Sequence, residues 1–267
     1  MSENSLSSKP HPLHRLKSRL KRPKEKRTYN WRMLIIFPAW VTVAFVASNL
    51  LIAGLLILLD WLHMSASSFL RPSILQTAIA TLIYILTIGI SIAGPYVLSK
   101  KFTTTLDDLG LSRLVSWTDI ALAPVTFILY TVVVGIVLTV VVSSIPGFPA
   151  DQAQDTGFKA LGSRTDNLLA FMTLVVLAPL AEETLFRGYL YGKLKKYVPG
   201  IVAALATSLL FGVAHSQWNV GIDVFILSLF LCGLRSLTGS IWAGVLVHMI
   251  KNGIAYYLLF VSPLIGG

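Results

Sequence analysis

The sequence contains very little cysteine and few charged residues. Its 267 residues include one cysteine, Cys232, which excludes an internal disulfide and a C-x-x-C metal site. Charged residues make up 13% of the chain, whereas a soluble globular domain carries about a quarter. Apolar residues make up 55%, and the mean hydropathy is +0.73. This composition predicts a polytopic membrane protein.

Several apolar stretches exceed the roughly 20 residues that are needed to cross a bilayer as a helix. Pro199-Gly200, residues 219–221 and residues 238–240 are expected to break the later stretches apart. We therefore expect an all-α fold, a polytopic membrane bundle of about seven transmembrane helices. These helices are predicted at about 33–59, 74–98, 118–143, 167–196, 200–216, 221–237 and 240–261.

Most of the net charge of +10 lies in one tail. Residues 1–32 hold ten Lys and Arg against Glu3 and Glu25, and we expect this tail to be disordered. It directly precedes a hydrophobic span, so the positive-inside rule explains it as a cytoplasmic segment and no nucleic-acid partner is expected. The sequence thus predicts a multi-pass protein of the cell membrane, in contact with the lipid bilayer, with a cytoplasmic N-terminus. Alternation of the spans then places residues 100–101 and 193–196 in the cytoplasm and the loop 146–166 outside.

Three formal charges interrupt the apolar run at residues 182–187, which read EETLFR. An ionisable group deep in a bilayer costs at least about 2.5–3.5 kcal/mol, so such groups face a protein interior or a wet cavity. Glu183 and Arg187 are four residues apart on one helix face, and a simple buried ion pair explains them. Glu182 points about 100° away and has no partner nearby in sequence, which makes it the candidate general base or acid.

Two histidines also lie among apolar neighbours, and each by itself could be a hydrogen-bonded packing residue. Glu182 and His215 are almost equally far from the turn at Pro199-Gly200, so an antiparallel hairpin brings them to the same depth. His248 fits less well, because two further reversals place it some turns away from His215 in depth. Asn252 follows His248 by four residues and shares its helical face.

A carboxylate and an imidazole that share one water form a hydrolytic site. In this interpretation Glu182 takes the proton, His215 orients the water, and His248 and Asn252 stabilise the oxyanion. The sequence contains no G-x-S-x-G and no H-E-x-x-H motif. A divalent metal such as zinc, held by Glu182, His215 and His248, is the second alternative.

The same residues resemble the three motifs of the CPBP family, which comprises CAAX proteases and bacteriocin-processing enzymes and is also called the Abi family. Glu182–Arg187 resembles its EExxxR motif, Phe211–His215 its FxxxH motif, and His248–Asn252 its HxxxN motif. The motifs occur in the family's order, and the resemblance covers about residues 165–260. It divides the chain into N-terminal transmembrane helices at 33–145 and a four-helix catalytic core at 167–262.

The resemblance implies an intramembrane protease of the glutamate type. It implies that Glu182 is the catalytic base and His215 its partner on the water, with an oxyanion pocket of His248 and Asn252. Supporting roles go to Glu183, Arg187 and Phe211. Members of the family are often labelled metalloproteases, but the motifs do not settle a metal requirement.

We therefore expect a CAAX prenyl endopeptidase-like hydrolase that cleaves a membrane-associated peptide or protein tail near the cytoplasmic half of the bilayer. By analogy with bacterial members, peptide maturation or bacteriocin self-immunity fits this compact chain better than prenylated substrates. Two alternatives remain. One is a non-enzymatic membrane scaffold or immunity protein, and the other is a transporter with Glu182 or Asp223 as a proton relay.

Overall fold

The computed structural model describes residues 28–100, 102–149, 152, 154–158 and 161–262. Within these residues all regular structure is helical, which confirms the all-α prediction. The predicted disorder of residues 1–32 concerns mainly residues 1–27, which lie outside the described residues.

Three long helices precede the predicted catalytic core. They are α2 (Met33–Trp61), α4 (Pro72–Ser99) and α6 (Trp117–Ser144), with the single-turn helices α3 (Ala66–Phe69) and α5 (Leu106–Leu109) between them. Each long helix lies within a few residues of its prediction. Thr105 and Ser116 cap α5 and α6 by accepting hydrogen bonds from Asp108 and Asp119 backbone N–H groups, which explains where these helices begin.

The predicted helix at 167–196 is one continuous rod from Arg164 to Tyr197, but its winding changes along its length. It comprises α7 (Arg164–Phe171), the π-helical η1 (Met172–Leu177), α8 (Ala178–Glu182), the π-helical η2 (Glu183–Leu190) and α9 (Tyr191–Tyr197). π-Helical turns are rare in proteins, and those that occur frequently lie at functional sites. Here the change of winding falls directly after Glu182.

The remaining helices are α10 (Gly200–Ala214), α11 (Trp218–Thr238), α12 (Trp242–Tyr256) and the π-helical η3 (Tyr257–Val261). In the described residues, six helices are long and apolar enough to span a membrane. α10 is apolar but has 15 residues, about 22 Å, which is short of the roughly 30 Å hydrocarbon core. The expected seven spans are thus six full-length helices and one short one.

The break expected at residues 219–221 was wrong. These residues lie inside α11, and the chain turns instead at 215–217, where Ser216 has a φ of 58°. Gly221 serves helix packing, since a Cβ added to Gly212 of α10 would lie 2.8 Å from the Gly221 carbonyl oxygen. The breaks expected at Pro199-Gly200 and at residues 238–240 are confirmed, and Gly239 ends α11 in the left-handed conformation.

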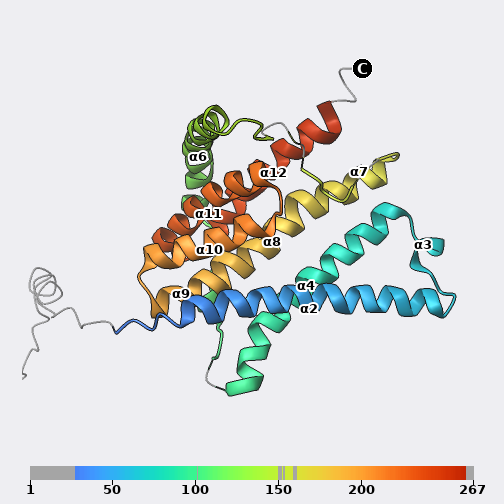
Figure 1. Ribbon diagram of the computed structural model, residues 1–267, viewed down its shortest axis with the longest axis horizontal. Helices are drawn as coiled ribbons and strands as arrows, with labels where there is room; N and C mark the ends of the chain where they lie inside the picture. The colour runs from blue at the N-terminus through green and yellow to red at the C-terminus, as the bar shows by residue number, and fades with distance from the viewer. Residues whose placement is uncertain (1–27, 101, 150–151, 153, 159–160, 263–267) are drawn as a thin grey trace, which may run out of the picture.

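The helices form two groups that meet along the 164–197 rod. α2 and α4 cross one another on one side, and α10, α11 and α12 lie together on the other (Figure 1). α6 packs outside α11 and α12, whereas α2 also contacts α10. The 164–197 rod therefore contacts both groups and carries Glu182, Glu183 and Arg187 between them.

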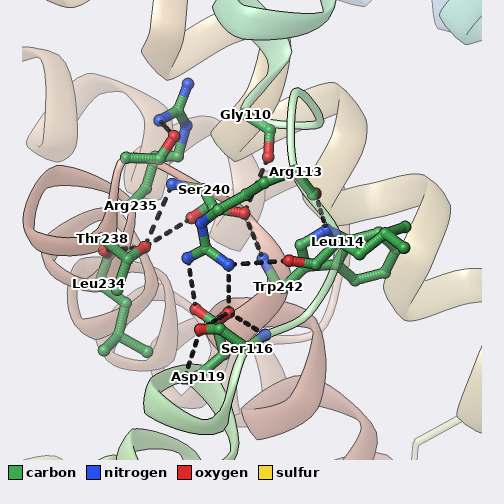
Figure 2. Close-up of polar contacts among 11 residues, drawn as sticks. Gly110, Arg113, Leu114, Ser116, Asp119, Leu234, Arg235, Thr238, Ser240 and Trp242 are labelled. Atoms are coloured by element: carbon green, nitrogen blue, oxygen red, sulfur yellow. Dashed lines mark hydrogen bonds and ion pairs between the residues drawn. The ribbon is translucent and has the colours of Figure 1, made fainter.

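A connector of residues 102–116 closes one end of the bundle. Figure 2 shows how the loop between α11 and α12 holds it: Ser240 Oγ donates to the Gly110 carbonyl at 2.9 Å, and Trp242 Nε1 donates to the Arg113 carbonyl at 2.7 Å. Arg113 in turn donates to Asp119 at 2.9 Å. At the same end, the Asn30 amide donates to the Tyr197 carbonyl, so α2 begins beside the end of α9.

Asp108 of the connector forms ion pairs with Lys193 at 3.2 Å and Lys196 at 2.5 Å. Partial burial of the carboxyl raises its pKa. The hydrogen bonds from Lys196, the Thr105 amide and Lys193 outweigh that effect and lower the pKa of Asp108 to about 2. The connector is thus tied by charge to the last turn of α9.

Candidate active site

A cavity of about 550 Å³ lies between the two groups of helices. α2 and α4 line it on one side, α10 and α12 on the other, and residues 154–156 of the long loop contribute to its rim. Its walls are mainly apolar, and Glu182 of the 164–197 rod is among its polar groups. The cavity brings together five of the predicted residues, Glu182, Phe211, His215, His248 and Asn252.

Glu183 and Arg187 form the predicted ion pair. Arg187 Nη1 lies 2.7 Å from Glu183 Oε1, and both side chains are completely buried. Gly244 of α12 makes room for this carboxylate, since a Cβ there would lie 2.9 Å from Glu183 Oε2. The charge of Glu183 is thus balanced inside the protein, which suits a supporting residue.

Glu182 has a different environment, although it is the next residue. Its side chain is 17% exposed and lines the cavity. Tyr84 of α4 donates a hydrogen bond to Glu182 Oε1 at 2.8 Å. Among the described residues, no Lys or Arg forms an ion pair with Glu182. Its carboxylate therefore faces the cavity with a neutral donor as its hydrogen-bond partner.

His248 lies closer to the two glutamates than the depth argument from the sequence expected. Its Nδ1 is 3.1 Å from Glu183 Oε1, and its Nε2 is 3.8 Å from Glu182 Oε2. A carboxylate can only accept, so Nδ1 carries a proton in the contact with Glu183. The 3.8 Å separation is too long for a direct hydrogen bond and leaves Nε2 near the cavity.

The tilt that this contact requires was not readable from the sequence. α12 begins beside the connector and packs against α8, so that its third residue, Gly244, and its seventh, His248, both lie against Glu183. The depth argument from the sequence assumed that all helices are straight and cross the membrane over the same length. In the structure α10 ends after 15 residues, and part of the 164–197 rod beside it is π-helical. Counting residues from the chain reversals therefore did not predict that His248 lies at the depth of Glu182 and Glu183.

His215 is oriented by its own helix. Its Nδ1 lies 2.8 Å from the Phe211 carbonyl oxygen, which can only accept, so Nδ1 carries the proton. In a neutral imidazole, Nε2 is then a hydrogen-bond acceptor. His215 lines the same cavity as Glu182, as the hairpin argument predicted.

The ring of Phe211 packs at the centre of this group. Its centroid lies 4.9 Å from that of His215 and 6.0 Å from that of His248. The Arg187 guanidinium carbon lies 4.4 Å from the Phe211 ring, within reach of a cation–π interaction. Phe211 therefore separates the buried ion pair from the cavity and restricts both imidazoles.

Asn252 is held by an apolar neighbour's backbone. Its Nδ2 donates to the Leu174 carbonyl at 2.9 Å, which leaves the second N–H of the amide for another acceptor. Leu174 belongs to η1, so the π-helical turn provides the carbonyl that orients this side chain.

Sequence reasoning missed Tyr84 and a second polar group beside the cavity. Lys251 lines the cavity and forms an ion pair with Asp223 at 3.1 Å, and Tyr130 donates to the same aspartate. A hydroxyl within the apolar stretch 74–98 was the available signal for Tyr84. Its distance of 98 residues from Glu182 hid the contact. Asp223 is a paired charge here rather than an isolated one.

The zinc alternative stays a prediction. In the described part of the chain, no group of three or more His, Cys, Asp and Glu side chains is placed to hold a metal ion. Glu182, His215 and His248 line one cavity but do not converge as a ligand set.

The comparisons with known proteins concern the segment that holds all these residues. Residues 164–254 match the family model described as Rce1-like, type II CAAX prenyl endopeptidase. An uncharacterized 24.3 kDa protein from Escherichia coli is 38% identical over 89 residues, which are 32% of this chain and 41% of that protein. No solved structure matches the chain. The chain thus spans less than half of that relative, and the three motifs all lie within the segment that is similar to the Rce1-like family of CAAX proteases.

Proposed function

We propose that the protein is an intramembrane endopeptidase in which Glu182 activates a water. The observation that carries the proposal is the contrast between two adjacent carboxylates. Glu183 is buried against Arg187, whereas Glu182 faces the cavity and receives a hydrogen bond from Tyr84. Two neighbouring acids in such different environments are suited to different tasks, and Glu182 is the one placed to take a proton.

His215 completes the water site. A water in the cavity donates one hydrogen to Glu182 and the other to Nε2 of His215, whose Nδ1 proton is held by Phe211. This leaves an oxygen lone pair for the carbonyl carbon of the scissile bond. As the C–O bond forms, the water's proton passes to Glu182, and Glu182 later gives it to the leaving nitrogen as the C–N bond breaks.

His248 and Asn252 are the donors for the oxyanion. A protonated His248 donates Nδ1–H to Glu183 and directs Nε2–H into the cavity beside the free N–H of Asn252. With His248 in this form, Glu182, Glu183, Arg187 and His248 carry no net charge together. A neutral group of charges costs less to keep within a membrane than an unbalanced one.

The apolar lining of the cavity indicates the class of substrate. Phe45, Leu210, Val213 and Leu259 line the cavity with apolar surface, which suits a hydrophobic peptide or protein tail associated with the membrane. The six spanning helices make the chain a multi-pass membrane protein, and we place it in the cell membrane with its N-terminus in the cytoplasm. A scaffold or immunity protein would use the same cavity for binding alone.

The test compares membrane peptides by mass spectrometry from cells that express the wild type or Glu182→Gln. We expect peptides that depend on the wild type to disappear in the variant, while the variant remains folded and inserted. Thr184→Val is the matched control, because Thr184 is half-buried on the same rod and donates its hydroxyl hydrogen bond to the Leu180 carbonyl of its own helix. Unchanged peptides in Glu182→Gln would favour the scaffold. Metal analysis of the purified protein tests the zinc alternative separately.

A further inference from the structure

We infer that Lys251 binds a carboxylate of the peptide substrate, which is either the free C-terminus of the peptide or an acidic side chain. The inference rests on the proposed function and adds a specificity-determining residue to the same cavity. Three features carry it. They are the position of Lys251 on the face of α12 that lines the cavity, the ion pair that holds Lys251, and the lack of other cations among the described lining residues.

Lys251 lies on the same face of α12 as the proposed oxyanion donors. His248, Lys251, Asn252 and Ala255 all line the cavity, and they share a helix face because they lie three, four and seven residues apart. Three residues of an α-helix rise about 4.5 Å, so Lys251 is about one turn from His248. A group that binds Lys251 can therefore belong to the same peptide whose carbonyl oxygen meets His248 and Asn252.

An aspartate and a tyrosine from two other helices hold the Lys251 ammonium. Asp223 Oδ2 of α11 lies 3.1 Å from Lys251 Nζ, and the buried Tyr130 of α6 donates a hydrogen bond to Asp223 Oδ1. Three helices thus fix the position of this ion pair. An ammonium has three N–H donors, so the contact with one carboxylate oxygen leaves donors for a second anion.

The charges around the cavity explain why a substrate carboxylate needs this lysine. Lys251 is the one Lys or Arg among the described residues that line the cavity, whereas Asp155 and Glu182 line it as acids. These two carboxylates would repel a third one, and the apolar walls screen such repulsion less than water does. Asp223 is not among the described lining residues, so the lysine lies on the cavity side of its ion pair.

Peptide binding to a variant without the proposed base tests the inference. Glu182→Gln in nanodiscs is titrated with three fluorescent probes, and their dissociation constants are compared. The probes are dansyl-Leu-Val-Phe-Leu with a free C-terminal carboxylate, the same peptide with a C-terminal amide, and dansyl-Leu-Val-Glu-Leu with a C-terminal amide. We expect a probe with a carboxylate to bind about tenfold to hundredfold more tightly than the neutral amide, since a hydrogen bond to a charged group has this strength. The probe that binds most tightly identifies the source of the carboxylate.

Removal of the cation should abolish this preference. Lys251→Met together with Asp223→Asn, added to Glu182→Gln, leaves no charge of the ion pair without its partner, and the three probes should then bind with similar affinity. Asp223→Asn alone frees the ammonium from its partner and should increase the preference. Lys196→Met is the matched control and should leave the preference unchanged, because Lys196 is exposed and pairs with Asp108 of the connector.

Equal affinity of the three probes for Glu182→Gln would overturn the inference, as would the absence of binding by all three. A preference that survives Lys251→Met with Asp223→Asn would also overturn it, because another group would then hold the carboxylate. Binding of the probes does not depend on hydrolysis. Failure of the comparison of cellular peptides and failure of this experiment are therefore distinguishable.

Discussion

His248 Nδ1 lies 3.1 Å from Glu183 Oε1, although the two residues are 65 positions apart in the chain. This contact joins the buried ion pair to the cavity. Glu183 is shared between Arg187, which balances its charge, and His248, which it orients.

Breaking the buried pair should cost stability, whereas removing both partners should cost less. Arg187→Met leaves the Glu183 charge buried without its cation, and we expect a loss of about 3–5 kcal/mol. The double variant Glu183→Leu with Arg187→Met should recover much of that loss but remain inactive, because His248 loses its acceptor. Thermal unfolding in detergent and peptide cleavage measure the two effects.

Lys196→Ala is the control for that comparison, because Lys196 is 47% exposed and its pair with Asp108 should contribute about 1 kcal/mol or less. A double variant as unstable as Arg187→Met alone would contradict the account of a charge left without its partner.

Gly244→Ala should displace Glu183. The added Cβ would lie 2.9 Å from Glu183 Oε2, and that carboxylate is held by Arg187 and His248 and cannot easily move. We expect a stability loss of about 1–3 kcal/mol and a larger loss of activity. Gly233→Ala on α11 is the matched control, since its Cβ would meet no atom within 4 Å. Equal activity in the two variants would show that the approach of α12 is not critical.

Tyr84→Phe should lower kcat with little change in KM. The variant keeps the ring but removes the hydroxyl that donates to Glu182 Oε1, so the carboxylate loses the bond that fixes its orientation. A hydrogen bond to a charged group of this strength corresponds to about a tenfold to hundredfold loss of kcat. Tyr189→Phe removes the hydroxyl of a buried tyrosine that is not among the residues lining the cavity, and this variant should behave as the wild type. A change in KM alone would assign Tyr84 to substrate binding instead.

Asp108→Asn should destabilise the protein at neutral pH but not in strong acid. The pKa of Asp108 falls from its ordinary 3.8 to about 2 on folding, so its ionised form favours the folded state. That contribution is present above about pH 4 and is lost as the pH falls toward 2. Unfolding of wild type and variant, measured from pH 7 to pH 2, should therefore differ at first and converge. A constant difference would mean that the ion pairs with Lys193 and Lys196 are not its source.

The sequence by itself determined the membrane class, the positions of most helices and the candidate residues Glu182, His215 and His248, which line one cavity. Low charge and long apolar runs allow little except spanning helices, because backbone polar groups in lipid must be satisfied within a helix. Glu182, His215 and His248 stood out because ionisable groups are costly in lipid, and equal distance from Pro199-Gly200 placed the first two in one cavity. The three motifs also predicted the family whose model residues 164–254 match.

Only the tertiary structure decided how these groups share their contacts. The π-helical winding after Glu182, the short α10 and the close approach of Gly244 brought His248 to Glu183, against the expectation from depth. Tyr84 of α4 contacts Glu182 although the two residues are 98 positions apart in the chain. Periodicity along the chain fixes which side chains share a helix face. It does not fix the relative tilt and depth of separate helices, which depend on the packing of side chains between them.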